Sequence, residues 1–388
     1  MKRGHLISFL YGASTLMFMQ FFVRYLLNTG FNSQNLGLVM AIAFTIDLII
    51  SIPTGVLADT LGVKKVSIIG LSVLVIASFL GSFSSNWILI TLGFFLYKIA
   101  DSTVSGVINL WAKNIPDSNV GSSGLIFTRL DQMQRIGMVL MAIFTGFLIQ
   151  KTGYNSSKPW ILSMLVTLIL ILVASKTDCT SSVQAKYRST KEVLNKLKNN
   201  LNGNKNLQLA LAGVFVLGIA EGLMNSKYWV WIVEDLKLGS PLAIALIVGF
   251  LSASRVAGQE FFVRTIKNER SRFLTALFGI SVITFVFATN LPPIILAALW
   301  FVRVFVYASY FPLLSKELET FSDPETVSSI LSSAPLLNAT GAIIGGLSCS
   351  TLKMNSSETF ITMAFLCLIS SALWFFALSP SKKPAPSF

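Results

Sequence analysis

The chain has 388 residues, of which 53% are hydrophobic and only 12% are charged, whereas soluble domains carry about 25% charged residues. This composition excludes an ordinary soluble protein and predicts that lipid surrounds much of the chain. The net charge of +13 does not indicate nucleic-acid binding, because Lys and Arg gather in short segments between long apolar runs.

Apolar runs long enough to cross a bilayer, about 20 residues each, follow one another along the whole chain. Twelve runs are recognised: 6–27, 35–58, 66–84, 87–109, 125–149, 159–175, 207–230, 241–263, 273–290, 292–314, 327–350 and 358–378. The first run resembles a signal peptide, but it is longer than a signal core and has no clear cleavage site, so we interpret it as a retained helix. The sequence therefore predicts an all-α membrane protein with twelve transmembrane helices.

The distribution of Lys and Arg predicts the orientation of these helices. Twelve crossings place both termini on one side of the membrane. With the termini inside, the inner segments carry 19 Lys and Arg residues and the outer loops carry 5. Such an excess is typical of cytoplasmic segments, so we predict cytoplasmic N- and C-termini in a multi-pass protein of the cell (plasma) membrane.

The longest stretch without an apolar run, residues 176–206, is basic and falls after the sixth run. Within it, residues 189–201 place Val and Leu at helical spacing, which fits either an amphipathic helix on the membrane surface or a solvated tether. A weak internal repeat supports division into six plus six helices. The predicted units are an N-terminal six-helix bundle at 1–175, a cytoplasmic basic linker at 176–206, a C-terminal six-helix bundle at 207–380 and a cytoplasmic tail at 381–388.

A charged turn follows the second apolar run. Its residues match the skeleton G-x-x-x-D-x-x-G-x-[RK]-[RK] at Gly55, Asp59, Gly62, Lys64 and Lys65, although Thr60 replaces a usual basic residue. With the six-plus-six arrangement and the basic central segment, this motif resembles that of the major facilitator superfamily. The resemblance implies two pseudo-symmetric six-helix bundles. It also implies that Asp59 caps a neighbouring helix and that the loop acts as a cytoplasmic gating motif.

The residues before this turn, SIPTGVLAD, resemble the E-x-P-[ST]-G-x-x-A-D pattern of bacterial drug-efflux members, with Ser51 in place of Glu. Asp47 lies one helical turn earlier on the same face. Further on, SGVINLW (105–111) resembles S-G-x-x-E-A-W, with Asn109 for the acid, whereas 137–149 lacks the Pro-containing antiporter signature. The resemblance implies a protein of a bacterial inner or cytoplasmic membrane that exports its substrate, as in drug resistance.

Charged residues at mid-depth in a membrane helix are unfavourable and usually mark a pathway. Three acids lie at this depth, Asp47, Asp101 and Glu221, and we predict that they couple transport to protons. Four bases are expected as their charge partners in the cavity: Lys98, Arg135, Arg255 and Arg303. Lys98 and Asp101 are three residues apart and can also form a purely structural pair. The family's packing would bring Arg303 to Glu221.

Other polar residues leave two interpretations open. Arg129, Asp131 and Glu260 lie near the inner ends of their runs, where side chains can reach water, and are weak candidates for the site. Four further residues either line the substrate cavity or form hydrogen bonds between helices: Gln20, Asn109, Asn225 and Asn338. Gly341 and Gly345 stand at G-x-x-x-G spacing and predict close helix packing.

The sequence contains no G-x-x-x-x-G-K-[ST] phosphate loop, so direct use of ATP is not expected. One His and three Cys show no metal-ligand spacing, and no nucleophile–base pair is recognised, so we expect no enzyme activity, metal or cofactor.

The first hypothesis is proton-coupled export of an amphiphilic small molecule or antimicrobial compound by a monomer, through alternating access. The alternatives are proton-coupled uptake of a small nutrient and a non-transporting membrane receptor of the same fold.

Overall fold

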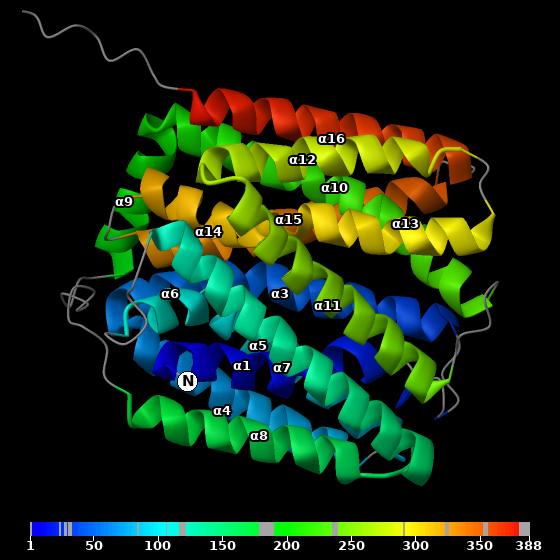
Figure 1. The fold of residues 1–388 in the computed structure, drawn as a ribbon. Helices are drawn as coiled ribbons and strands as arrows, with labels where there is room; N and C mark the ends of the chain where they lie inside the picture. The colour runs from blue at the N-terminus through cyan, green and yellow to red at the C-terminus, as the bar shows by residue number, and fades with distance from the viewer. Residues whose placement is uncertain are drawn as a thin grey trace, which may run out of the picture.

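The computed structural model describes residues 2–22, 25–26, 29, 33–83, 85–105, 107–115, 122–177, 190–234, 240–289, 292–322, 326–351 and 356–379. In this part of the chain the helices run back and forth along a common direction (Figure 1). Nine of them are long and apolar enough to cross a membrane. The predicted all-α membrane fold is confirmed, and the count of twelve crossings stays a prediction.

The helices follow the predicted apolar runs. The first part of the chain forms α1 (Arg3–Leu16), a π-helical turn η1 (Met17–Phe21), α3 (Ser33–Leu61), α4 (Val63–Gly81), α5 (Trp87–Val104), α6 (Ile108–Lys113), α7 (Ser123–Thr152) and α8 (Lys158–Ser175). The second part forms α9 (Thr190–Gly203), α10 (Lys205–Glu234), α11 (Pro241–Thr265), α12 (Glu269–Val286), α13 (Pro293–Val306), a 3-10 turn η4 (Tyr307–Ser309), α14 (Tyr310–Phe321), α15 (Val327–Thr351) and α16 (Ser356–Leu378).

Local sequence signals set several helix boundaries. The side chains of Asn86, Ser122 and Asn268 accept hydrogen bonds from the first turns of α5, α7 and α12, as helix-capping residues do. Gly62 separates α3 from α4 with a φ of 94°, a left-handed conformation that glycine adopts without strain. The predicted turn at Gly62 is therefore confirmed.

Two groups of helices make up the bundle (Figure 1). Helices α1, α3, α4, α5, α6, α7 and α8 pack together, as do α10, α11, α12, α13, α14, α15 and α16, whereas contacts of α7 with α11 and of α3 with α15 join the two groups. We call these the first and second groups below. The predicted domain boundaries themselves stay a prediction.

Glycines allow the closest helix contacts within each group. A Cβ atom at Gly137 of α7 would overlap the carbonyl oxygen of Phe9 in α1. Likewise, Cβ atoms at Gly341 and Gly345 of α15 would overlap backbone atoms of α10. The packing role that G-x-x-x-G spacing predicted for these two glycines is confirmed.

Three predicted runs are not single α-helices in the part of the chain that the structure describes. The run 87–109 divides into α5 and α6, the run 292–314 divides into α13, η4 and α14, and the run 6–27 divides into α1 and η1. The sequence has Gly106 at the first division, and glycine weakens a helix interior by about 1 kcal/mol relative to alanine. The first two divisions place short helices α6 and α14 at one end of the bundle (Figure 1).

Helix α9 lies in the basic central segment 176–206, for which the sequence left open either a membrane-surface helix or a solvated tether. Residues 190–203 are helical, and Leu197 and Leu201 pack against the hydrophobic core. The side-chain amide of Asn200 donates a hydrogen bond to Thr326 Oγ1 at 3.2 Å. This portion is therefore a helix held against the bundle and not a free tether, whereas residues 178–189 and the tail at 381–388 lie outside the described residues.

The outer surface of the bundle is apolar. Large hydrophobic side chains on several helices are exposed, among them Leu140, Phe144, Leu172, Val282 and Phe376. Soluble monomers rarely expose contiguous apolar surfaces of this kind. The exposed side chains therefore face the lipid that the composition predicted.

Candidate functional site

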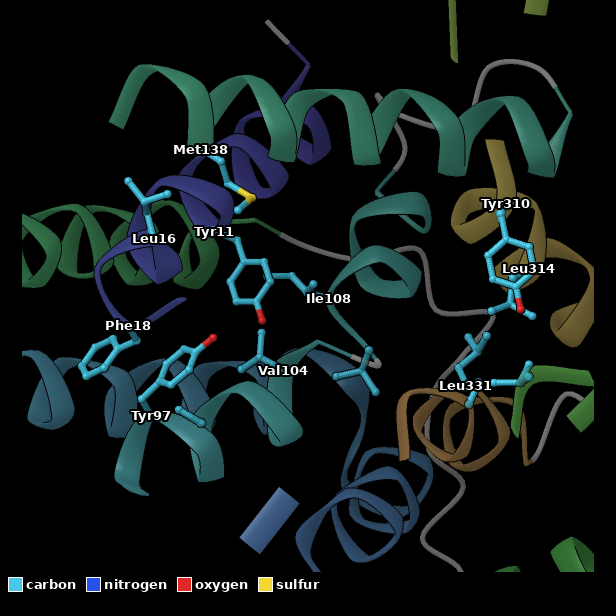
Figure 2. Packing of buried hydrophobic residues seen from close by; sticks show 14 of the residues in the cluster. Tyr11, Leu16, Phe18, Tyr97, Val104, Ile108, Met138, Tyr310, Leu314 and Leu331 are labelled. Carbon is cyan, nitrogen blue, oxygen red and sulfur yellow. The ribbon is translucent and has the colours of Figure 1, made fainter. Parts of the chain in front are cut away.

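A central cavity of about 450 Å³ lies where the two groups of helices meet. Its lining comes from Ser105 after α5 and from α6 and α7 in the first group, and from α10, α11, α14 and α15 in the second. This volume falls in the range of small-molecule pockets, about 300–1,000 Å³. Figure 2 shows part of its apolar lining, where Tyr310, Leu314 and Leu331 gather.

Asp131 of α7 is the centre of an ion-pair cluster in this cavity. Arg255 of α11 donates two hydrogen bonds to its carboxylate, from Nε to Oδ2 at 3.0 Å and from Nη2 to Oδ1 at 3.2 Å. The side-chain amide of Gln259 donates to the same Oδ2 at 2.5 Å. This bidentate geometry is the strongest form of arginine–carboxylate contact. It joins the first group of helices to the second inside the bundle.

A second guanidinium approaches the same carboxylate. Arg135 Nε lies 3.6 Å from Asp131 Oδ1, which is an ion pair but too long for a hydrogen bond. The guanidinium of Arg255 also lies over the ring of Phe311, with its central carbon 4.8 Å from the ring centroid. The carboxylate of Asp131 therefore balances the charges of two guanidinium groups. The ring of Phe311 also stabilises the guanidinium of Arg255 by a cation–π contact.

Sequence reasoning underrated Asp131 and missed Gln259. The sequence predicts that Asp131 lies near the inner end of its apolar run, where its side chain can reach water. However, α7 begins at Ser123, which puts Asp131 about 12 Å along the helix at 1.5 Å per residue, and its side chain is only 9% exposed. The available signal was the four-residue spacing of Asp131 and Arg135, which places both on one helix face.

Asp47 lies in a polar cluster within the first group of helices. Ser102 of α5 donates a hydrogen bond to Asp47 Oδ1, and Lys98 Nζ lies 3.9 Å from Oδ2. The hydroxyl of Ser51 also contacts Oδ1 at 3.3 Å. The sequence spacing allows Lys98 to pair with Asp101 on its own helix, and the structure also brings it to Asp47 on α3.

Asp101 is held by a tyrosine from another helix. The hydroxyl of Tyr11 in α1 donates to Asp101 Oδ1 at 2.7 Å. Figure 2 shows the hydroxyl groups of Tyr11 and Tyr97 directed into the same space between α1 and α5. Asp47 and Asp101 are therefore held among α1, α3 and α5 by hydroxyl donors as well as by charge.

Glu221 and Arg303 form a pair within the second group. Arg303 Nη2 donates to Glu221 Oε1 at 2.6 Å, and the Arg303 side chain is only 2% exposed. Trp300 and Tyr307 lie beside the guanidinium, with centroids 5.1 and 5.8 Å from its central carbon. The pairing implied by the family resemblance is thus present, and its role in proton coupling stays a prediction.

The structure does not bring all predicted site residues into one cavity. Arg135, Arg255, Asn109 and Asn338 line the central cavity. Its described lining does not include the three acids Asp47, Asp101 and Glu221 or their partners Lys98 and Arg303. Gln20 and Asn225 lie in described helices, but their side chains are not among those that the structure describes.

The end of the bundle that carries Lys64, Lys65 and Lys113 is closed by contacts between the two groups; we call it the basic end. Asp59 at the end of α3 accepts hydrogen bonds from the backbone N–H groups of Ser328 and Ser329, at 3.0 and 2.8 Å, and from the Ser329 hydroxyl at 2.5 Å. A carboxylate at a helix N-terminus is favourable because it meets the positive end of the helix dipole. Asp59 therefore caps α15 across the interface.

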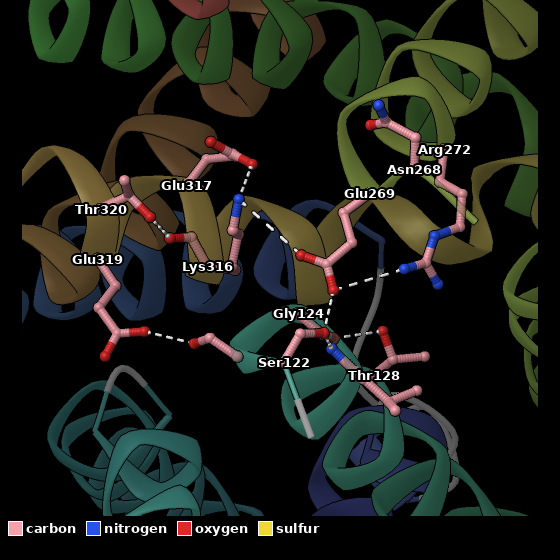
Figure 3. Close-up of polar contacts among 12 residues, drawn as sticks. Ser122, Gly124, Thr128, Asn268, Glu269, Arg272, Lys316, Glu317, Glu319 and Thr320 are labelled. Carbon is pink, nitrogen blue, oxygen red and sulfur yellow. Dashed lines mark hydrogen bonds and ion pairs between the residues drawn. The ribbon is translucent and has the colours of Figure 1, made fainter. Parts of the chain in front are cut away.

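A second closing contact involves the start of α7. Glu269 of α12 accepts a hydrogen bond from Ser122 and pairs with Arg272 and Lys316, as Figure 3 shows. Glu319 of α14 accepts a hydrogen bond from Ser123 at 2.8 Å and pairs with Lys113. Carboxylates of the second group thus hold the N-terminus of α7, just as Asp59 of the first group holds that of α15.

We expect Asp59→Ala to open the basic end more often. Each hydrogen bond to a charged group contributes about 1.5–3 kcal/mol, so losing even one of the three bonds of this cap should shift the equilibrium toward the open state by at least about 10-fold. A single cysteine placed in the cavity as Ser315→Cys, in a chain whose native cysteines are replaced, should then react faster with a membrane-impermeant maleimide applied from the basic end.

Thr60→Ala is the matched control for this experiment. Thr60 is the next residue on the same turn and is also buried, but its hydroxyl bonds the backbone of its own helix at Val56 and Leu57. Its removal should leave the labelling rate unchanged. Equal labelling rates in Asp59→Ala and the parent chain would show that the cap does not control opening.

Comparison with known proteins gives consistent matches over most of the chain. A family model described as Major Facilitator Superfamily matches residues 5–316. The chain is 23% identical over 385 residues to the uncharacterized MFS-type transporter YxaM of Bacillus subtilis (strain 168), covering 95% of this chain and 93% of that protein.

Solved structures show the same fold at low sequence identity. A variant of the E. coli fucose:proton symporter FucP has a TM-score of 0.74 at 14% identity, covering 97% of each chain. FucP in its outward conformation has a TM-score of 0.73 at 16% identity, covering 97% of this chain and 98% of that one. The human organic anion transporter MFSD10 (TETRAN) has a TM-score of 0.71 at 13% identity, covering 96% and 97%.

Proposed function

The chain belongs to the Major Facilitator Superfamily of transporters, and from that premise we propose that it exports an amphiphilic small molecule in exchange for protons. The cavity lies between two groups of helices that hydrogen bonds and ion pairs join at the basic end. Rocking of the groups about such a site is how alternating access works. We further propose a monomer in the plasma membrane with bundles at 1–175 and 207–380.

The observation that carries this proposal is the ion-pair cluster around Asp131. It lies in the cavity, and its partners come from both groups of helices. Buried charges in a membrane protein are unfavourable unless they are paired, and they mark ion or substrate pathways. A carboxylate shared across the moving interface is suited to bind a proton in one state of the transporter and a guanidinium in the other.

We expect Asp47→Asn to abolish the acceleration of transport by a pH gradient. The variant keeps the hydrogen-bonding shape of the side chain but cannot take up and release a proton beside Lys98 and Ser102. The measurement compares flux with and without an imposed gradient in proteoliposomes. Asp47→Glu is the matched control, because it retains the acid, and it should keep part of the acceleration.

The result that would exclude this role for Asp47 is a full rate with unchanged pH dependence in Asp47→Asn. Asp101→Asn and Glu221→Gln, measured in the same way, then show whether either of the other two predicted acids supplies the coupling. Retained coupling in all three single variants would leave Asp131 as the acid to replace next.

The direction of transport is tested separately. Export with proton exchange predicts that inverted vesicles with an acidic interior accumulate the substrate, whereas proton symport into the cell predicts that they release it. Uptake is the alternative suggested by the symporter named among the similar structures. A growth-inhibition panel with and without expression of the chain identifies compounds for this assay, and export predicts resistance to at least one amphiphilic compound.

A further inference from the structure

The central cavity carries more positive than negative charge. Its described lining contains two guanidinium groups, those of Arg135 and Arg255, and a single carboxylate, that of Asp131. Arg255 occupies both oxygens of that carboxylate in a bidentate pair. Arg135 shares one of the same oxygens from 3.6 Å. In the described lining, two bases therefore depend on one acid, and the cavity has a net charge of about +1.

Two donor nitrogens of Arg135 also lack strong acceptors. Its Nε is buried and has no hydrogen-bond partner among the described residues. Its Nη1 donates to the sulfur of Met138 at 3.4 Å, and a thioether is a weak acceptor. A buried donor without a good acceptor is destabilising. An anionic group placed at this guanidinium would supply both the missing acceptors and the missing negative charge.

The rest of the cavity fits an apolar body. The charged side chains stand on α7 and α11, whereas Tyr310, Leu314 and Leu331 on α14 and α15 form an aromatic and aliphatic wall (Figure 2). Small-molecule sites commonly combine such a wall with a few polar groups that fix the orientation of the ligand. The lining therefore suits a molecule with an acidic group at one end and an apolar ring or chain at the other.

We propose that the central cavity binds an organic anion, with its carboxylate or similar acidic group on Arg135 and its apolar body against the wall formed by α14 and α15. This inference names the substrate class of the transporter and rests on the proposed function. Because the cavity lies between the two groups of helices, the bound anion would be exposed at whichever end opens.

The test uses the purified full-length chain in detergent and three ligands that share one ring system and differ in charge: 1-naphthaleneacetate, 1-naphthaleneacetamide and 2-(1-naphthyl)ethylammonium. Isothermal titration calorimetry measures their dissociation constants. The carboxylate should bind at least about tenfold more tightly than the amide, as expected for hydrogen bonds to a charged group. The ammonium should bind least tightly, because the cavity is positive.

Variants of Arg135 connect this preference to the residue. Arg135→Met should weaken binding of the carboxylate by about 10- to 100-fold and leave binding of the amide unchanged. Arg135→Lys keeps the charge without the planar fork and should cause a smaller loss, which preserves the test if Arg135→Met does not fold. Arg264→Met is the matched control, since it removes a guanidinium that is 77% exposed and lies outside the described lining of the cavity.

Equal or tighter binding of the amide or the ammonium, no measurable binding of any of the three, or equal losses in Arg135→Met and Arg264→Met would overturn the anion site. Different results would contradict the proposed function of proton-coupled transport. Arg135-dependent binding of the carboxylate without any flux driven by a pH gradient in proteoliposomes would contradict proton-coupled transport and leave the anion site intact. Flux of only the amide or the ammonium would retain transport and overturn the anion site.

Discussion

Asp131→Asn is expected to abolish transport and to lower the free energy of unfolding by about 3–5 kcal/mol, the loss typical of removing one partner of a buried ion pair. The carboxylate is 9% exposed and balances Arg255 and Arg135 at once. Without it, two guanidinium groups would face each other inside the bundle. Equilibrium unfolding in mixed detergent micelles measures the stability, and flux in proteoliposomes measures transport.

Glu260→Gln is the matched control for Asp131→Asn. Glu260 also joins the two groups of helices, by a contact with Arg129 at 2.5 Å, but it is 29% exposed. Its loss should lower stability by at most about 1 kcal/mol, as for ion pairs that water can reach. If the two variants lose similar amounts of unfolding free energy, burial does not increase the contribution of the Asp131 cluster to stability.

The second large effect is expected from Arg303→Met. This change removes the base that neutralises Glu221 and leaves a carboxylate in an apolar, aromatic environment. The expected loss of stability is again about 3–5 kcal/mol. Arg264→Met, which removes a base that is 77% exposed, should cost at most about 1 kcal/mol.

A double variant separates structure from function at this pair. Glu221→Gln combined with Arg303→Met leaves no buried charge behind, so much of the stability lost in Arg303→Met should return. If transport returns with stability, the pair serves only to hold α13 against α10. If stability returns and transport does not, Glu221 or Arg303 takes part in coupling, as the sequence predicted.

Three of the sets of charged groups described above differ in their relation to the two moving groups of helices. Asp47 with Lys98 lies within the first group of helices, and Glu221 with Arg303 lies within the second. Asp131 with Arg255 joins the two groups beside the cavity. Of these three sets, only the third must change when the groups move apart around the cavity. Its variants are therefore expected to affect conformational exchange as well as stability.

Several features could be predicted from the sequence because they depend on neighbouring residues. Apolar runs of about 20 residues predict membrane helices whatever their partners are, and the described helices follow those runs. The turn at Gly62 depends on the one residue type that adopts a positive φ without strain. The G-x-x-x-G spacing predicted a close contact at Gly341 and Gly345, although it could not name α10 as the partner.

The sequence by itself thus determined the helices, their membrane setting and the family motif, because hydropathy, glycine and charge act over one or two helical turns. Only the tertiary structure decided which charges meet. Asp131 and Arg255 are separated by 124 positions in the chain, and their contact depends on how α7 and α11 are rotated against each other. Hydrophobic periodicity does not encode that rotation, because the helix faces that pack against other helices are as apolar as those that face lipid.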